Sequence, residues 1–341
     1  MHKRSGALEA VPPFDLRRSL DFIGGFGPLA GEQRVAEGEE EGEGGTLTKA
    51  IMVDGKPVIF RVSGAGKDLP GSSQTKVRYE LFSEEELPDQ VAERVAGRIS
   101  FILSLDDDVR PFYAIAEKDL PFYPIVERLR GLHHVKFPSL LEISCWAILN
   151  QRVQMLLAKR MKRALVERFG ASVSFEGSTY WAFPDYERMK RATPRELLEA
   201  TRNQRTAVRL GSLLENFEDL DERFLRTALY EKAEERLRRV NGIGEWAAQF
   251  ILFRGLGRVE RLRYNMRPVE RMLQELYGPG KTLDDINRQY GPWCGYWSLY
   301  LWGSGMAERL AKGKREKKKG EEEKEKKEEE EEGEGKAGPT P

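Results

Sequence analysis

Apolar residues in the first third of the chain follow the pattern of β-strands. β-Branched runs stand on either side of Asp54-Gly55, a dipeptide that suits a two-residue turn, so we expect a hairpin over residues 50–62. Residues 76–82 alternate between apolar and polar, and residues 99–105 form a short apolar run, so both are predicted strands. With a helix expected over residues 84–96 between them, this region predicts a small antiparallel sheet in an α+β domain.

From Asp107 onward the apolar residues recur at spacings of three and four, which is typical of amphipathic helices. The sequence Thr193-Pro-Arg-Glu196 suits a helix start, because it combines a capping box with proline in the first turn. One polar step, residues 150–152, interrupts an apolar helical pattern. The residues expected on the apolar face around this step are Leu141, Cys145, Ile148, Leu149, Val153, Leu157, Met161 and Leu165.

Two predicted helices, residues 231–239 and 245–253, are joined by the short sequence Val240-Asn-Gly-Ile-Gly244. This is the pattern of a helical hairpin with a glycine turn. Gly242 can adopt a positive φ and lets a ligand approach the backbone, while Gly244 leaves the N–H groups of the next helix unobstructed. Such a turn can hold phosphate. An ordinary connection between helices is the other interpretation, and the turn alone does not decide between them.

Charge is distributed unevenly, although the whole chain has 56 basic and 56 acidic residues. Residues 136–310 contain 29 Lys and Arg against 22 Asp and Glu, a net charge of +7, whereas residues 1–135 have a net charge of −6. The basic part contains the hairpin, as a nucleic-acid surface requires. After residue 311 the chain is almost entirely Lys, Glu and Gly, with a net charge of −1, and is predicted to be disordered.

The two cysteines, Cys145 and Cys294, stand in apolar patterns and are expected to be buried thiols. Two cysteines exclude a four-cysteine iron–sulfur cluster within the chain, and neither a metal nor a cofactor is expected. No apolar run has the length of a membrane span. We therefore expect a soluble, cytoplasmic (intracellular) protein that does not associate with membranes.

Four segments together resemble the helix-hairpin-helix DNA glycosylases, in particular the branch of 3-methyladenine DNA glycosylase II. They are Leu141-Glu-Ile-Ser-Cys-Trp-Ala-Ile-Leu-Asn-Gln-Arg-Val153, Phe183-Pro184, Val240-Asn-Gly-Ile-Gly-Glu-Trp246, and the stretch from Trp293 to Trp302. The resemblance covers most of residues 100–305. Their order and spacing carry more weight than the hairpin alone.

Three parts of the chain are expected. Residues 1–106 form the N-terminal α+β sheet domain. Residues 107–310 form a mainly helical, glycosylase-like domain with the hairpin at 231–253. Residues 311–341 form a charged tail.

The resemblance implies a DNA-repair protein that binds duplex DNA as a monomer and flips a damaged, alkylated base out of the stack for hydrolysis of the base–sugar bond. Each group of site residues follows from a matching motif position. The family's wedge falls on Asn150, Gln151 and Arg152, with Arg152 as the plug; the phosphate-binding turn falls on Gly242, Ile243 and Gly244; the base pocket falls on Trp246, Phe250 and Trp302, with Trp146, Tyr123 and Trp181 as weaker candidates.

The family's catalytic Asp is followed by an aliphatic residue three positions later and a basic residue five positions later. Val269 and Arg271 match those two places, so the Asp position falls on Met266, which has no charge. The nearest acids are Glu260 and Glu270. Three hypotheses follow: a glycosylase by family resemblance, a non-catalytic DNA-binding or lesion-sensing protein, and a glycosylase that uses a displaced acid.

Two further features surround this position. Bifunctional members have a lysine where this chain has Trp246, so a lyase activity through that residue is disfavoured. The surrounding loop is basic, which suits either a grip on DNA or a solvated surface. Its arginines are Arg254, Arg258, Arg261, Arg263, Arg267 and Arg271.

Overall fold

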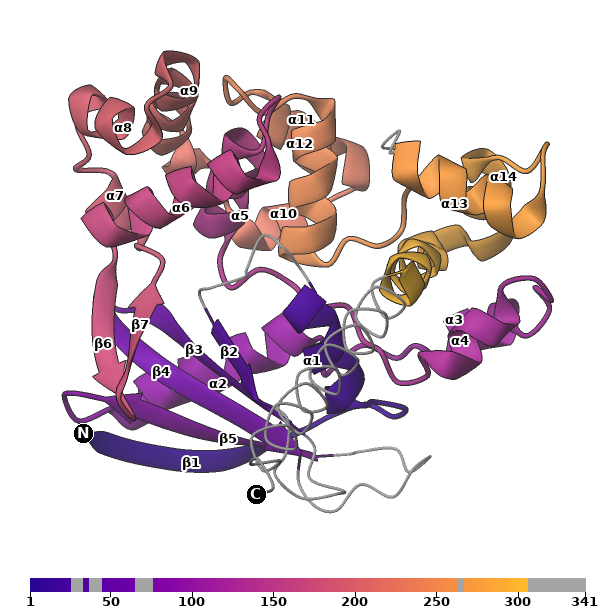
Figure 1. The fold of residues 1–341 in the computed structure, drawn as a ribbon, viewed down its shortest axis with the longest axis horizontal. Helices are drawn as coiled ribbons and strands as arrows, with labels where there is room; N and C mark the ends of the chain where they lie inside the picture. Colours follow the sequence, from indigo (N-terminus) through magenta and orange to yellow (C-terminus); the bar gives the residue numbers. More distant parts are fainter. Residues whose placement is uncertain (26–32, 37–44, 65–75, 263–266, 306–341) are drawn as a thin grey trace, which may run out of the picture.

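The computed structural model describes residues 1–25, 33–36, 45–64, 76–262 and 267–305. A five-stranded antiparallel sheet occupies the lower left of Figure 1, with helices above it and to its right. The spatial order of the strands is β1, β5, β4, β3, β2. Their bounds are β1 His2–Glu9, β2 Gln33–Ala36, β3 Thr46–Val53, β4 Lys56–Gly64 and β5 Lys76–Ser83. The predicted α+β class, with a small N-terminal antiparallel sheet, is confirmed.

Strands β3 and β4 form the hairpin predicted around Asp54-Gly55. Asp54 and Gly55 have φ values of 50° and 78°, and Val53 pairs with Lys56 across the turn. Positive φ at both central residues gives the turn whose twist matches that of the flanking strands. The predicted strand over 76–82 is confirmed as β5, which pairs with β4 on one side and with β1 on the other.

The strand predicted over residues 99–105 is wrong, because most of this run belongs to helix α2 (Asp89–Leu103). Val95, Ile99 and Ile102 are all buried, and their spacing of four and three puts them on one helical face. The helix expected over 84–96 therefore begins later and extends to Leu103, where Ser104 ends it with a φ of 52°.

Helices form most of the chain after α2, and residues 294–305 are helical as well. The helix start predicted at Thr193 is confirmed, because the Thr193 and Glu196 side chains make both hydrogen bonds of a capping box. The bounds are α1 Leu16–Gly25, α3 Arg110–Ala116, α4 Tyr123–Arg128, α5 Leu140–Leu149, α6 Met155–Phe169, α7 Tyr186–Met189, α8 Pro194–Thr201, α9 Gln204–Glu215, α10 Glu222–Thr227, α11 Tyr230–Arg238, α12 Glu245–Phe250, α13 Arg267–Tyr277 and α14 Leu283–Tyr290.

The expectation of helix throughout the region after Asp107 is also wrong, because β6 (Ala171–Phe175) and β7 (Ser178–Ala182) form a second hairpin. Val173 and Phe175 are buried at alternate positions, as in a strand with one face covered. The Phe175 ring lies 4.3 Å from the Phe82 ring, centroid to centroid, so this hairpin packs on the N-terminal sheet. Figure 1 shows it along the left edge of that sheet.

Two large hydrophobic cores, and a smaller one between the N-terminal sheet and the β6–β7 hairpin, hold the described residues together. One core joins the N-terminal sheet to α1–α4, α13, α14 and the helix at 294–305. The other joins α5, α6 and α8–α12, and every residue of α5 is buried in it. The division at residue 106 lies between α2 and α3, both of which contribute to the first core, and the three-domain scheme stays a prediction.

Helix α6 buries two of the residues predicted on its apolar face, Met161 and Leu165, but not Leu157. Its buried residues are Ala158, Met161, Lys162, Leu165 and Val166, which recur at spacings of three, one, three and one. Leu157, which the pattern placed on the apolar face, is 44% exposed. Leu157 lies four residues before Met161 in the same helix, but it belongs to the first turn of α6, which the core does not cover.

Both cysteines are buried free thiols, as predicted. Burial raises the pKa of the Cys294 thiol to about 12 and that of the Cys145 thiol further. In the described part of the chain, no helix combines the length and the apolar content that crossing a membrane requires. The predicted tail at residues 311–341 lies outside the described residues.

Candidate nucleic-acid interface

The predicted hairpin joins α11 to α12 through an exposed glycine turn. Gly242 has a φ of +97°, in the left-handed region that favours glycine. Ile243 is buried in the core, and its N–H donates to the carbonyl of Val240 at 3.0 Å. A Cβ built on Gly244 would meet no atom within 4 Å. Ile243 therefore anchors the turn, while open space lies in front of Gly244.

The segment between α5 and α6 contains the predicted wedge, Asn150 to Arg152. Arg152 is exposed and has a φ of +56°. Such a backbone conformation costs a residue with a Cβ about 1–3 kcal/mol, and residues of this kind cluster at ligand sites. The conformation lets the chain turn from α5 into α6 and leaves the Arg152 side chain outside the core.

A hydrogen-bonded chain ties the wedge segment to the hairpin. Gln151 Nε2 donates to the carbonyl oxygen of Gly242 at 2.7 Å, and Arg209 Nη1 donates to Gln151 Oε1 at 2.6 Å. Gln151 is thus engaged within the protein, whereas Arg152 projects outward. Sequence reasoning missed Arg209, because an arginine in the middle of α9 gives no signal that distinguishes it from a surface cation.

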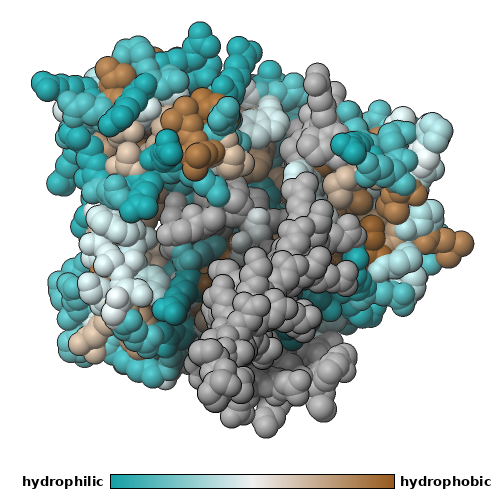
Figure 2. Space-filling model, viewed as in Figure 1, coloured by the Kyte–Doolittle hydropathy of each residue, from teal (hydrophilic) through white to brown (hydrophobic). Residues whose placement is uncertain are grey.

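These elements line an open cavity of about 460 Å³. Its lining combines both predicted segments: Asn150, Gln151, Arg152, Gly244, Glu245, Trp246 and Ala247. Trp246 is partly buried and its ring stacks on Phe250, with 5.2 Å between centroids and 11° between planes. Figure 2 shows exposed apolar surface at the upper left, over the region of α5 to α9, bordered by hydrophilic surface.

The other predicted aromatic residues lie elsewhere. Trp302 is partly buried on the helix at 294–305 and packs against the first core, whereas Trp246 and Phe250 pack against the second. Trp146 is fully buried in α5, and Trp181 on β7 packs against the second core. Tyr123 begins α4. Trp246 therefore lines the 460 Å³ cavity, whereas Trp302, Trp146 and Trp181 are not among the described residues that line it.

The position expected to hold the catalytic Asp, Met266, lies outside the described residues, as does Asn265. Of the two nearest acids, Glu260 accepts a hydrogen bond from Arg258 Nε at 2.6 Å. Glu270 lies in the first turn of α13. The Glu260 carboxylate is therefore held by a cation of its own loop.

Arginines around this loop serve the protein interior as well as its surface. Arg258 and Arg261 lie over the Tyr230 ring, at 5.5 and 5.2 Å, and Arg261 also pairs with Glu231. Arg254 is buried, with its guanidinium 4.9 Å from the Phe22 ring. Burial raises the pKa of the Tyr230 hydroxyl. These three arginines hold structure together, and Arg263 lies outside the described residues.

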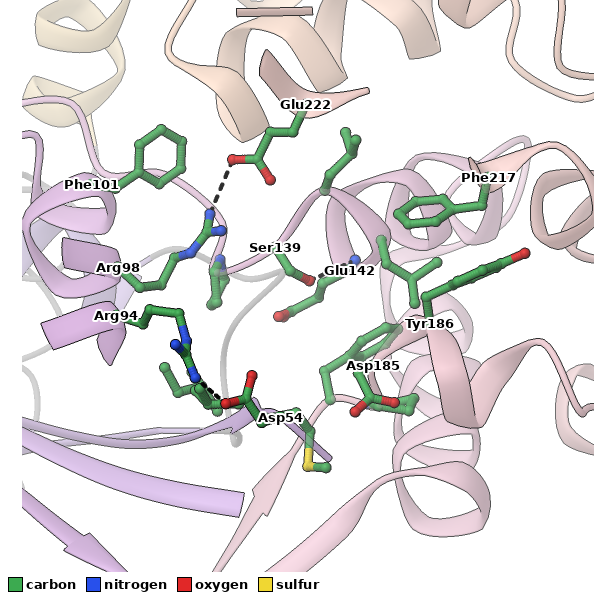
Figure 3. Close-up of a pocket in the computed structure, with 18 of the residues that line it drawn as sticks. Asp54, Arg94, Arg98, Phe101, Ser139, Glu142, Asp185, Tyr186, Phe217 and Glu222 are labelled. Carbon is green, nitrogen blue, oxygen red and sulfur yellow. Dashed lines mark hydrogen bonds and ion pairs between the residues drawn. The ribbon is translucent and has the colours of Figure 1, made fainter. Parts of the chain in front are cut away.

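A larger cavity, of about 600 Å³, lies between the N-terminal sheet, α2 and the start of α5. Figure 3 shows two ion pairs toward its left side, Arg98 with Glu222 and Arg94 with Asp54, and the neighbouring rings of Tyr186 and Phe217, tilted by 31°, on its right. The charges of these two ion pairs thus neutralise one another. This cavity lies at the opposite end of α5 from the wedge segment.

Glu142 lines this larger cavity, and its carboxylate accepts a hydrogen bond from Lys162 Nζ at 2.7 Å, with both side chains 2% exposed. The pair joins α5 to α6 within the core. Its charges compensate one another, so it fixes the two helices on either side of the wedge segment.

Comparison with known proteins shows that the chain is similar in sequence and fold to DNA glycosylases. No protein-family model matches the chain. A DNA-3-methyladenine glycosylase of Bacillus subtilis is 28% identical over 228 residues, which cover 62% of this chain and 72% of that protein.

Two solved structures share the fold. The 3-methyladenine DNA glycosylase of Archaeoglobus fulgidus has a TM-score of 0.66 at 21% identity, covering 87% of this chain and 97% of the other. The 8-oxoguanine glycosylase/lyase of Clostridium acetobutylicum, in complex with double-stranded DNA, has a TM-score of 0.64 at 16% identity, covering 91% and 99%. The described architecture, including the N-terminal sheet, is therefore the fold that these two structures share.

Proposed function

We propose, on the premise that this chain belongs to the helix-hairpin-helix DNA glycosylase superfamily, that it is a DNA-repair glycosylase. It binds damaged duplex DNA as a monomer inside the cell, flips an alkylated base and hydrolyses the bond between base and sugar. The hairpin turn at Gly242–Gly244 holds a backbone phosphate through its N–H groups, which fixes position without reading sequence. Arg152 fills the space that the flipped base leaves, since its guanidinium can stack and donate hydrogen bonds.

One observation carries this proposal: the wedge segment and the hairpin line one cavity and are hydrogen-bonded to each other. The 2.7 Å bond from Gln151 to Gly242 fixes the distance between the plug and the phosphate-binding turn. An enzyme that flips a base needs both contacts at once, because the phosphate grip must hold the strand while the plug replaces the base. A plain helical connection has no need of this link.

The aromatic surface beside the turn supports an alkylated substrate. Trp246 lines the cavity and stacks on Phe250, so one π face is presented next to the wedge. A base that carries a positive charge is attracted to such a face by about 0.5–2 kcal/mol. The substrate class we propose is therefore a cationic, alkylated purine.

A second candidate function is non-catalytic recognition of lesions. It is favoured by Met266, which stands where the resemblance expects the catalytic Asp, and by the pairing of Glu260 with Arg258 at 2.6 Å. A methionine cannot stabilise the positive charge that develops on the sugar. The same interface would then hold a flipped base without releasing it.

Binding is tested by Gly244→Ala. The new methyl group meets no protein atom within 4 Å, so the fold should be unchanged. In the bound complex it obstructs the phosphate, and affinity for duplexes with an abasic-site analogue should fall about tenfold, which equals the loss of one charge-assisted hydrogen bond. Gly211→Ala in α9, where a Cβ also meets nothing within 4 Å, is the control. Equal affinity in both variants would contradict the phosphate-binding turn.

Catalysis is tested by base release from duplexes with alkylated purines, followed by alkaline cleavage at abasic sites. If the natural chain releases the base and the variant Glu260→Gln or Glu270→Gln does not, the replaced glutamate is the displaced catalytic acid. Binding without release, together with release gained in Met266→Asp, assigns the lesion-recognition function. A chain that binds lesion and intact duplex equally at matched salt would contradict both.

A further inference from the structure

Three large apolar residues at the start of α6 are exposed together. Met155, Leu156 and Leu157 are 44%, 60% and 44% exposed. Successive residues of a helix point about 100° apart, so three in a row cannot share one face. Their joint exposure means that the first turn of α6 itself stands out from the protein. We call these three residues the α6 tip.

The α6 tip is not needed for the core. Helix α6 is held by the buried face that begins at Ala158 and continues through Met161 and Leu165. Exposed apolar residues are ordinary when scattered, whereas contiguous ones mark a surface that meets another molecule. The side chains of the α6 tip are thus available to a partner at no cost to packing.

Charge and position identify the partner. The α6 tip directly follows the wedge segment, whose Arg152 lines the 460 Å³ cavity, so the two surfaces are continuous. Arg152 before it and Arg160 after it are exposed, and neither forms an ion pair with an acid in the described part of the chain. An apolar projection between cations complements a duplex, whose stacked base faces are apolar and lie between two rows of phosphates.

Resting on the proposed function, we propose that the α6 tip inserts into the minor groove and wedges open a base step beside the flipped nucleotide. Unstacking costs least at flexible pyrimidine–purine steps, and an apolar wedge turns this difference into affinity. The α6 tip is therefore a specificity element, which makes binding depend on the deformability of the step next to the lesion. It reads no base edge.

The experiment uses the full chain and two duplexes, each of which contains one abasic-site analogue. The duplexes differ only in the base step next to the analogue, which is TA in one and GC in the other. Affinities come from fluorescence anisotropy, and bending comes from energy transfer between labelled duplex ends. Leu156→Gln keeps length and helix propensity but removes apolar surface. Leu120→Gln, at a 78% exposed leucine between α3 and α4, is the matched control.

We expect the natural chain and Leu120→Gln to prefer the TA duplex and to bend it. Leu156→Gln should lose about tenfold in affinity for the TA duplex, as expected for one leucine returned to water, and with it most of the preference. Its salt dependence should be unchanged, because no charge is removed.

Two results overturn the inference while leaving the proposed function intact. In the first, Leu156→Gln binds both duplexes as the natural chain does. In the second, sedimentation shows that the natural chain is a dimer and that Leu156→Gln is a monomer, which would assign the α6 tip to contact with a second copy. Failure of the natural chain to bind either duplex would instead contradict the proposed function and the inference with it.

Discussion

Replacing Gly242 with alanine probes the link between hairpin and wedge directly. A Cβ at this position would stand 2.7, 2.8 and 3.0 Å from Cγ, Cβ and Cδ of Arg209. Those carbons cannot move freely, because Nη1 of Arg209 is bound to Gln151 at 2.6 Å. The added methyl group must therefore displace either the hairpin turn or the residue that holds Gln151.

Two terms set the size of the effect. The positive φ of Gly242 costs an alanine about 1 kcal/mol or more. Overpacking against Arg209 adds about 1–3 kcal/mol. The expected loss of stability is thus about 2–4 kcal/mol. Gly280→Ala isolates the first term, because Gly280 has a φ of +103° and a Cβ there meets nothing within 4 Å.

Urea unfolding followed by circular dichroism gives both free energies, provided that the m-values agree. Gly242→Ala should be more destabilising than Gly280→Ala by at least about 1 kcal/mol. In an Arg209→Ala background, where Cγ and Cδ are absent, the excess should shrink by about 1 kcal/mol. Equal losses in Gly242→Ala and Gly280→Ala would refute the reasoning, since the contact with Arg209 would then have no energetic weight.

Three further expectations concern single side chains. Arg209→Met removes the hydrogen bond to Gln151 but keeps the aliphatic part of the side chain. Its affinity for duplex with an abasic-site analogue, measured by fluorescence anisotropy, should fall several-fold more than that of Arg205→Met. Arg205→Met is the control, because it loses an exposed charge from the same helix. Lys162→Met leaves a buried carboxylate unpaired and should cost about 3–5 kcal/mol in urea unfolding, and adding Glu142→Leu should restore most of it. Burial lowers the pKa of Lys136 to about 8, so its charged form destabilises the folded state below that pH. The stability of the natural chain relative to Lys136→Met should therefore rise between pH 8 and about 10.5, and a flat difference would contradict this.

Local patterns predicted the fold where one period dominates. Asp54-Gly55 between two β-branched runs was sufficient for the first hairpin. The run at 99–105 was misassigned because a short apolar stretch fits a strand as well as the end of a buried helix, and the helical period only emerges when Val95 is included. The β6–β7 hairpin had a visible signal, the alternation of Val173 and Phe175 before Glu176-Gly177, but its five-residue strands are easily lost among helices.

The candidate site was predictable in its motifs and unpredictable in its couplings. Residues 150–152 and 242–246 could be singled out by resemblance, and the structure brings them around one cavity. Arg209 could not, because its role depends on the packing of α9 against α5 rather than on spacing. The exposure of Leu157 could not be predicted either, since it depends on how far the core extends along α6 rather than on helical spacing.

One residue of surplus length follows α12. Residues Ile251–Gly255 form a π-helical turn, in which the backbone accommodates more residues per turn than an α-helix. There Gly255 passes Ile143 of α5 so closely that a Cβ would lie 2.6 Å from its Cγ2. The turn therefore rotates the chain that follows it by about 100° relative to a regular α-helix of the same length. Residues 256–262, which follow the π-helical turn, leave α12 at an angle set by this one turn, so a single-residue deletion there would change their direction without altering any residue among them.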